Sequence, residues 1–217
     1  MTAADIKIKV CGLRERANVV AVEALRPDFL GFIFVPSSPR FVGADFDPAV
    51  LKELPRHSKT VGVFLNQSLD EVKAAVDKYH FPIVQLHGDE TPEYCGSLKE
   101  AFPHLEIMKA FSMRGSFDVH GIVPYNDVAN YLLFDTAGSM RGGGTGVTFD
   151  WNKLSAYRGH RPIFVAGGIS VEHATALKKL RATLPQLFGV DLNSRFETAP
   201  GVKSVALLSK FIRDIRT

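Results

Sequence analysis

Short runs of β-branched and aromatic residues recur along the chain, and each is almost continuously apolar rather than alternating with polar positions. Such runs are typical of strands buried on both faces, as in a parallel sheet covered by helices. Polar or glycine residues follow most runs, and each gap is long enough for one helix. We therefore predict strands at residues 6–10, 28–34, 60–65, 82–87, 105–110, 130–135, 161–166 and 186–192.

The segments between these runs carry apolar residues at helical spacing. One of them opens with Ser68 and has Glu71 three residues later, which is typical of a capping box at the start of a helix. The remaining stretches show the same apolar stripe without that signal. We predict helices at residues 15–25, 68–79, 170–184 and 202–215.

Eight alternating strand–helix units predict an α/β fold, a single (β/α)₈ barrel domain spanning residues 1–217. The alternative is a doubly wound open sheet. That fold usually has fewer strands and often carries a glycine-rich dinucleotide-binding turn after its first strand, and this turn is missing here. No linker, low-complexity stretch or half-chain repeat divides the sequence, so we expect one domain.

The composition is ordinary for a soluble globular protein, with 46% hydrophobic and 23% charged residues. A formal net charge of +3 without a long basic run does not indicate nucleic-acid binding, but it suits a small anionic substrate. The amino terminus does not resemble a signal peptide, and no apolar run reaches the roughly 18 residues of a membrane helix. We expect a cytoplasmic protein that binds neither nucleic acid nor membrane.

The two cysteines, Cys11 and Cys95, allow one disulfide but do not form the dense framework of a small secreted protein. The seven histidines are scattered, without the spacing of metal ligands. We therefore expect no metal site.

Active sites of (β/α)₈ barrels lie at the carboxyl ends of the strands, so residues just after each strand are the candidates for chemistry. Cys11 follows the first strand, and a partly open thiol at the barrel rim suits acid–base or nucleophilic work. Asp135 ends the apolar run YLLF, whose walls favour a protonated carboxyl that acts as an acid near neutral pH. The alternatives are a buried, inert thiol for Cys11 and a helix cap or salt-bridge partner for Asp135.

Three more residues at strand ends are candidates for binding a substrate. Arg40 lies in the proline-restricted loop PSSPR, which suits bidentate recognition of a carboxylate or phosphate, although a solvated arginine is the alternative. His87 closes the fourth strand, either as a pocket residue or as a histidine satisfied within the strand end. Asp191 lies near the end of the eighth strand.

Glycine-rich and polar turns follow the last two strands. Gly167 and Gly168 follow the seventh, and Asn193 and Ser194 follow the eighth, where barrels often bind phosphate through backbone N–H groups. A further segment, 140–151, lacks both the nucleotide P-loop and the dinucleotide-binding patterns. It predicts either an active-site lid or a long surface loop, with four glycines, Gly142, Gly143, Gly144 and Gly146.

Taken together, eight segments in register from residue 8 to 204 resemble the phosphoribosylanthranilate isomerase family. One departure lies after the eighth strand. The family motif there is commonly Asp-x-Ser-Ser-Gly-x-Glu, whereas residues 191–197 read DLNSRFE and place Arg195 at the glycine position. A left-handed backbone at that position would be strained with arginine. The matching segments are IKVCGLR, GFIFVPSSPR, VGVFLN, VQLHGDE, LLFDT, GGGTGVTFDW, AGGI and GVDLNSRFETAPGVKS.

The resemblance implies a (β/α)₈ barrel that carries out the cofactor-free Amadori rearrangement of N-(5-phosphoribosyl)anthranilate in tryptophan biosynthesis. By position, Cys11 matches the family's general base, Asp135 its general acid, and Arg40 the arginine that holds the anthranilate carboxylate. The turns after the last two strands match its phosphate site. Such a mechanism needs the two pKa values to shift in opposite directions, so we expect neighbouring cations and loop dipoles to lower the pKa of Cys11.

Two alternatives stay open from the sequence. Another phosphate-binding aldose–ketose isomerase with this fold would be expected to use two aspartates and to show a twofold internal repeat. A non-catalytic barrel that binds a phosphorylated metabolite would not need both Cys11 and Asp135. The sequence is compatible with a monomer or a homodimer.

Overall fold

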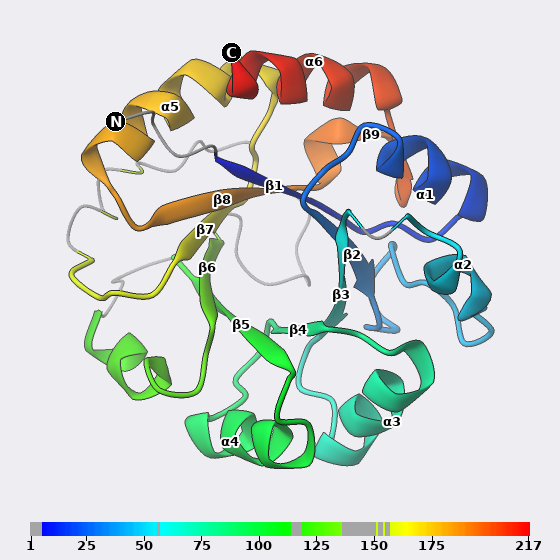
Figure 1. Ribbon diagram of the computed structural model, residues 1–217, viewed down its shortest axis with the longest axis vertical. Helices are drawn as coiled ribbons and strands as arrows, with labels where there is room; N and C mark the ends of the chain where they lie inside the picture. The colour runs from blue at the N-terminus through cyan, green and yellow to red at the C-terminus, as the bar shows by residue number, and fades with distance from the viewer. Residues whose placement is uncertain (1–5, 56, 114–118, 136–150, 152–153, 155–156) are drawn as a thin grey trace.

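The computed structural model describes residues 6–55, 57–113, 119–135, 151, 154 and 157–217. Eight parallel strands close into a barrel in which each strand pairs with its neighbours in sequence and β8 pairs with β1 (Figure 1). The predicted (β/α)₈ barrel is therefore confirmed, and the open sheet is excluded. The strands are β1 (Lys7–Cys11), β2 (Phe29–Ile33), β3 (Lys59–Phe64), β4 (Ile83–Leu86), β5 (Glu106–Ser112), β6 (Tyr131–Asp135), β7 (Ile163–Ala166) and β8 (Leu187–Leu192).

Helices surround the strands on the outside of the barrel (Figure 1). The capping box predicted at Ser68 is present: the Ser68 hydroxyl accepts from the Glu71 backbone N–H, and the Glu71 carboxylate accepts from the Ser68 N–H at 2.8 Å. The helices are α1 (Arg16–Glu23), α2 (Ala49–Lys52), α3 (Leu69–Tyr79), α4 (Pro92–Ala101), α5 (Ala174–Thr183) and α6 (Val205–Arg216).

Three connections differ from the regular strand–helix pattern. A 3₁₀ helix, η1 (Val119–Tyr125), lies between β5 and β6, and another, η3 (Val171–His173), precedes α5. The predicted helix at 202–215 begins too early, because Val202 and Lys203 form β10, which pairs with β9 (Glu197–Ala199). Ser204 then caps α6 by accepting from the Leu207 N–H. This hairpin brings residues 197–203 back to the end of β1.

Apolar side chains form two layers, one inside the barrel and one between the barrel and its helices. On β1, Ile8 and Val10 belong to the outer layer, whereas Cys11 packs in the inner one with Val61 and Leu133. Lys9 is two residues from Cys11 and therefore points to the same, inner side. Neither cysteine forms a disulfide, and in the described part of the chain no helix is long and apolar enough to cross a membrane.

Candidate active site

Cys11 is the last residue of β1 and lies inside the barrel mouth, with 3% of its surface exposed. Cys11 does lie at the carboxyl end of its strand, as predicted, but the predicted partial exposure of the thiol is wrong. The strand runs one residue further than the sequence pattern indicated, so the thiol stays within the packed interior. Gly31 makes room for it, because a Cβ at that position would lie 2.8 Å from Cys11 Sγ.

The charges of two buried lysines oppose the effect of burial on the pKa of the thiol. Burial raises the pKa of Cys11, while the charges of Lys9 and Lys203 lower it and that of Asp191 raises it. The net shift is upward, so the expected low thiol pKa is wrong. The cations act in the expected direction, but burial outweighs them. Lys9 Nζ lies 2.8 Å from Asp191 Oδ2, and both residues belong to the barrel interior.

Asp135 ends β6 and has 14% of its side chain exposed. His87 Nε2 lies 3.2 Å from Asp135 Oδ2, and the other ring nitrogen, Nδ1, lies 2.7 Å from Gln85 Nε2. Gln85 is buried in β4. His87 is therefore held between a buried amide and the candidate acid, which fixes the direction in which the imidazole faces the carboxyl group.

Asp191 connects the two candidate groups. Burial raises the pKa of Asp191, and the charge of Lys9 lowers it most strongly in return; the charge of His87 also lowers it, and that of Asp135 raises it. Asp191 therefore lies within electrostatic reach of Asp135 and His87 while it pairs with the lysine that acts on Cys11. Cys11 packs in the inner layer with Leu133, two residues before Asp135, so the thiol and the carboxyl group both lie on the inner side of the barrel.

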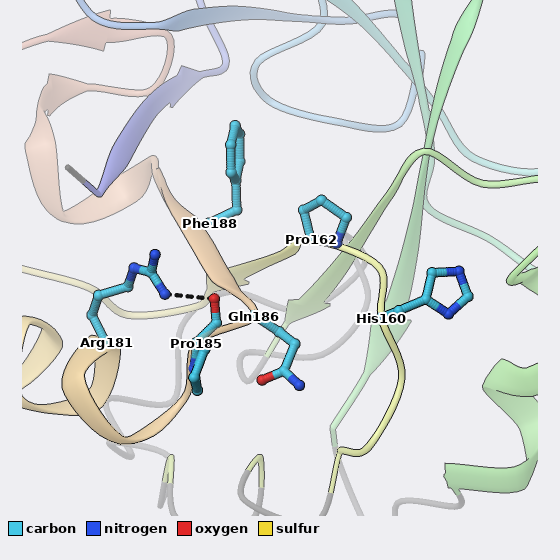
Figure 2. Close-up of a pocket in the computed structure, with 6 residues that line it drawn as sticks. All are labelled: His160, Pro162, Arg181, Pro185, Gln186 and Phe188. Carbon is cyan, nitrogen blue, oxygen red and sulfur yellow. Dashed lines mark hydrogen bonds between the residues drawn. The ribbon is translucent and has the colours of Figure 1, made fainter. Parts of the chain in front are cut away.

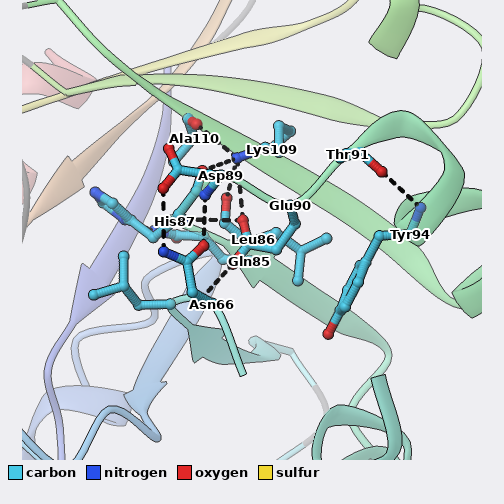
Figure 3. A network of polar contacts seen from close by, with 12 residues as sticks. Asn66, Gln85, Leu86, His87, Asp89, Glu90, Thr91, Tyr94, Lys109 and Ala110 are labelled. Atoms are coloured by element: carbon cyan, nitrogen blue, oxygen red, sulfur yellow. Dashed lines mark hydrogen bonds and ion pairs between the residues drawn. The ribbon is translucent and has the colours of Figure 1, made fainter. Parts of the chain in front are cut away.

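A buried ion pair fixes the loop that carries His87 (Figure 3). Lys109 Nζ donates to the Gly88 carbonyl at 2.6 Å and to Glu90 Oε2 at 3.2 Å. Glu90 also accepts from the backbone N–H groups of Gly88 and Asn66, both at 2.9 Å. The turn after β4 is thus held by the end of β3 and by β5, and it keeps His87 over the barrel.

Arg40 is bound by a carboxylate of the protein itself. Its Nε donates to both Glu197 oxygens at 2.9 and 3.0 Å, and its Nη2 donates to Glu197 Oε2 at 2.6 Å. Lys203 Nζ donates to the other side of this carboxylate, at 2.6 Å from Oε1. Although burial raises the pKa of Glu197, Arg40 and Lys203 outweigh it, and the pKa is lowered. The contacts with Glu197 therefore fix the position of Arg40, which is not a solvated surface arginine.

Gly12 joins this ion cluster to the thiol. Its φ is +82°, and a Cβ there would lie 2.8 Å from Arg40 Cδ, 2.9 Å from Asn193 Oδ1 and 3.4 Å from Lys203 Nζ. Only glycine fits this conformation and this space. The residue after Cys11 thus lets the arginine, the lysine and the asparagine approach the end of β1.

The two turns predicted to bind phosphate lie side by side, because β7 and β8 are paired. Gly167 and Gly168 both have positive φ, of 88° and 66°. Ser194 begins a three-residue 3₁₀ helix, η4 (Ser194–Phe196), and Asn193 Oδ1 accepts from Lys203 Nζ at 2.7 Å.

Arg195 lies inside η4 and is not among the residues with positive φ. The strain that arginine would meet in a left-handed conformation therefore does not arise. The candidate lid glycines, Gly142, Gly143, Gly144 and Gly146, lie outside the described residues.

A shallow pocket of about 310 Å³ opens at the opposite end of the barrel (Figure 2). Its walls include Pro162, which precedes β7, and Gln186, which precedes β8. It therefore does not belong to the carboxyl-end site. Within the described ranges no group of three or more His, Cys, Asp or Glu side chains is placed to hold a metal ion.

Sequence reasoning left Lys9, Lys203 and Gln85 without a role. A signal for Lys9 was present, because Lys7 and Lys9 alternate with apolar residues and so occupy one face of β1. Which face is the interior depends on pairing with β8, whose Asp191 is 182 residues away. Lys203 was assigned to a predicted helix, whereas it lies in β10. The helix assignment therefore gave no indication that Lys203 approaches the site.

Comparisons with known proteins identify the family of this chain. Residues 8–214 match the family model described as N-(5'phosphoribosyl)anthranilate (PRA) isomerase. An N-(5'-phosphoribosyl)anthranilate isomerase from Phocaeicola vulgatus is 40% identical over 209 residues, 96% of this chain and 97% of that protein.

Two solved structures also match. A phosphoribosyl anthranilate isomerase in complex with reduced 1-(o-carboxyphenylamino)-1-deoxyribulose 5-phosphate has a TM-score of 0.79, 25% identity and coverage of 97% of this chain and 98% of that one. Monomers generated from the dimeric phosphoribosylanthranilate isomerase of Thermotoga maritima have a TM-score of 0.78 with the same identity and coverage. This chain belongs to the N-(5'-phosphoribosyl)anthranilate isomerase family.

Proposed function

We propose that the protein converts N-(5-phosphoribosyl)anthranilate to 1-(2-carboxyphenylamino)-1-deoxyribulose 5-phosphate, an aldose–ketose isomerisation in tryptophan biosynthesis. The observation that carries the proposal is that Cys11 packs in the inner layer with Leu133, two residues before Asp135 on β6, so that the thiol and the carboxyl group both lie on the inner side of the barrel. A thiol and a carboxyl group at the carboxyl end of the strands suit two proton transfers on one sugar. Family membership supplies the substrate.

In the first step Asp135 gives its proton to the ring oxygen of the ribose. The bond between this oxygen and C1′ breaks, and the nitrogen of the anthranilate, which keeps its hydrogen, uses its lone pair to form a C=N bond, which gives a protonated open-chain Schiff base. His87, bound to Asp135 Oδ2, orients the carboxyl group for this transfer. Asp135 is left as a carboxylate, which the neighbouring imidazole stabilises.

In the second step the Cys11 thiolate removes the proton from C2′. The S–H bond forms, the electron pair of the C2′–H bond becomes the C1′=C2′ bond, and the nitrogen accepts the electrons of the former C=N bond. The resulting enolamine tautomerises to the ketone. Burial raises the pKa of Cys11 and so opposes its ionisation, while the charges of Lys9 and Lys203 stabilise the thiolate.

Arg40 is the candidate for holding the anthranilate carboxylate. Glu197 occupies the Nε–Nη2 edge of the guanidinium, which leaves the Nη1 side as the edge for a bidentate contact with a carboxylate. Glu197 therefore fixes the orientation of the guanidinium and does not occupy the edge that would bind the substrate carboxylate. The turns at Gly167–Gly168 and Asn193–Ser194 are the candidates for the phosphate, and Asp191 for a sugar hydroxyl.

The same proposal describes a single-domain, cytoplasmic enzyme that uses its own side chains and no cofactor. Its ligand is a small anion, in agreement with the net charge of +3. Monomer and homodimer remain the two alternatives for its assembly, and light scattering on the purified protein distinguishes them.

The test is to add purified protein to phosphoribosylanthranilate, to follow the loss of substrate fluorescence, and to identify the product by mass spectrometry and chromatography. The proposal predicts product without added metal or cofactor. Binding without turnover would favour a non-catalytic barrel. Turnover of a different aminoaldose phosphate alone would favour another isomerase of this fold.

A further inference from the structure

Lys9 is a buried charge that the two proton transfers do not use. The whole side chain is buried, and Nζ lies 2.8 Å from Asp191 Oδ2. The pair is built into the sheet, because Lys9 on β1 is in register with Asp191 on β8. Cys11 follows on the same face of β1.

The pairing keeps the lysine charged. Burial lowers the pKa of Lys9, but the charges of Asp191 and Cys11 raise it above its ordinary value. A buried ion pair costs desolvation and is seldom better for stability than well-packed apolar residues. The pair is also incompletely satisfied, because Asp191 Oδ1 is buried and has no hydrogen-bond partner among the described residues. These features are poor for stability alone and indicate a role in the site.

We propose that Lys9 is a positioning residue that stabilises the Cys11 thiolate, and that Asp191 opposes it by sharing the ammonium. This inference rests on the proposed function of Cys11 as the base. When the thiol is protonated, the ammonium is held by Asp191; when the thiol ionises, the same ammonium neutralises the new charge. Lys9 is fixed by the register of β1 and β8, so this stabilisation needs no rearrangement.

The other charged groups around Cys11 do not replace Lys9. Lys203 from β10 also lowers the pKa of the thiol, but it acts less strongly. Its ammonium donates to Glu197 and to Asn193, which hold it beside Arg40. His87 on the β4 turn is held at 3.2 Å from Asp135 on β6, and the charges of both act on Asp191.

The experiment measures ionisation of Cys11 without substrate. A Cys95→Ser background leaves one thiol, and the ¹³Cβ chemical shift of labelled Cys11 is followed against pH by NMR. Lys9→Met is expected to raise the midpoint by at least about one unit, since an opposite charge within about 4–6 Å shifts a pKa by roughly 1–3 units. Asp191→Asn is expected to lower it, because the ammonium is then shared with no other carboxylate.

Lys7→Met is the matched control. It removes the same charge from the same face of β1, but Lys7 pairs with Asp28 at the other end of the strand and is 40% exposed. Its midpoint should equal that of the Cys95→Ser parent. Circular dichroism checks the folding of every variant. If Lys9→Met does not fold, the opposite shift expected in Asp191→Asn still tests the proposal.

An unchanged midpoint in folded Lys9→Met, or an unchanged or raised midpoint in Asp191→Asn, overturns the proposal. Turnover of phosphoribosylanthranilate by Cys11→Ser, measured in parallel, separates it from the proposed function. If the NMR shifts occur but Cys11→Ser turns over normally, the electrostatic role of Lys9 holds and Cys11 is not the base. If Cys11→Ser is inactive and the midpoints do not move, the base is correct and Lys9 has no such role.

Discussion

The guanidinium of Arg40 and the carboxylate of Glu197 are joined by three short contacts between residues 157 positions apart in the chain. Glu197 lies in the short β9–β10 hairpin, and Lys203 of the same hairpin holds the carboxylate from its other side. The hairpin therefore places the Glu197 carboxylate at the end of β1, where it fixes the orientation of the arginine. We propose that substrate binding at Arg40 depends on this arrangement.

Arg40→Lys is expected to weaken substrate binding. A lysine keeps the charge but lacks the fork that binds Glu197 on one edge and a substrate carboxylate on the other. Loss of a charge-assisted hydrogen bond costs about 1.5–3 kcal/mol, so KM should rise about ten- to hundredfold with a smaller change in kcat. Steady-state kinetics measures both, with exposed Arg16→Lys as the control. An unchanged KM would remove Arg40 from the binding site.

Glu197→Gln is expected to change how stability depends on pH. Arg40 and Lys203 outweigh burial and lower the pKa of Glu197 in the folded protein. A lowered pKa stabilises the fold above the unfolded value of about 4.3, and this contribution is lost as pH falls through the folded value. The free energy of unfolding should therefore decline less steeply below pH of about 4.5 in the variant than in the parent.

Urea unfolding between pH 3 and pH 7 (roughly the range of carboxyl titration) measures this difference. At neutral pH the variant should be less stable by about 3 kcal/mol, because the buried Lys203 and the half-buried Arg40 lose their shared partner. Glu100→Gln makes the same change at an exposed position on α4 and should follow the parent. Parallel acid profiles for parent and Glu197→Gln would show that the carboxylate does not hold the cluster.

Cys11→Ser should separate chemistry from packing. The change is nearly isosteric, but a serine hydroxyl ionises far less readily than a thiol, so kcat should fall by about 10²–10⁴-fold. Melting curves should shift only slightly. Cys95→Ala, which alters the buried thiol of α4, should show the reverse pattern of lower stability and retained kcat. A large loss of stability in Cys11→Ser with normal turnover of the folded fraction would support an inert core thiol.

The pH–rate profile should show the raised pKa of Cys11, which burial causes. The ionised fraction of a base grows about tenfold per pH unit below its pKa. The ascending limb of kcat/KM should therefore extend above the ordinary thiol value of about 8.5 wherever that limb reports Cys11. A limb that levels off at or below about 8.5 would mean that a different group, or a thiol whose pKa is not raised, accepts the proton.

Local patterns predicted the barrel well because its strands are buried on both faces. The apolar runs located all eight strands within two residues, and Ser68 with Glu71 located the start of α3. The 3₁₀ helix before β6 and the β9–β10 hairpin were missed. The hairpin depends on tertiary contacts, because the ammonium of Lys203 in β10 binds Glu197 and Asn193 inside the fold.

Site residues were predicted where their type and their place at a strand end agreed, as for Cys11, Asp135 and Arg40. The environments of these residues were not predicted. Burial of the Cys11 thiol follows from one further residue in β1, a shift that no local pattern specifies. The groups that act on them, Asp191, His87 and Glu197, come from other elements of the fold, and contacts across a barrel are a long-range property.

The central claim is that the Cys11 thiol and the Asp135 carboxyl act on the same sugar. The most direct test is the turnover of phosphoribosylanthranilate by folded Cys11→Ala, folded Asp135→Asn and the double variant, followed by loss of substrate fluorescence. The account predicts that each single variant loses at least about a hundredfold in kcat, and that the double variant loses much less than the product of the two, because the groups act as a unit. Product formation at a rate near that of the parent in either single variant would contradict it.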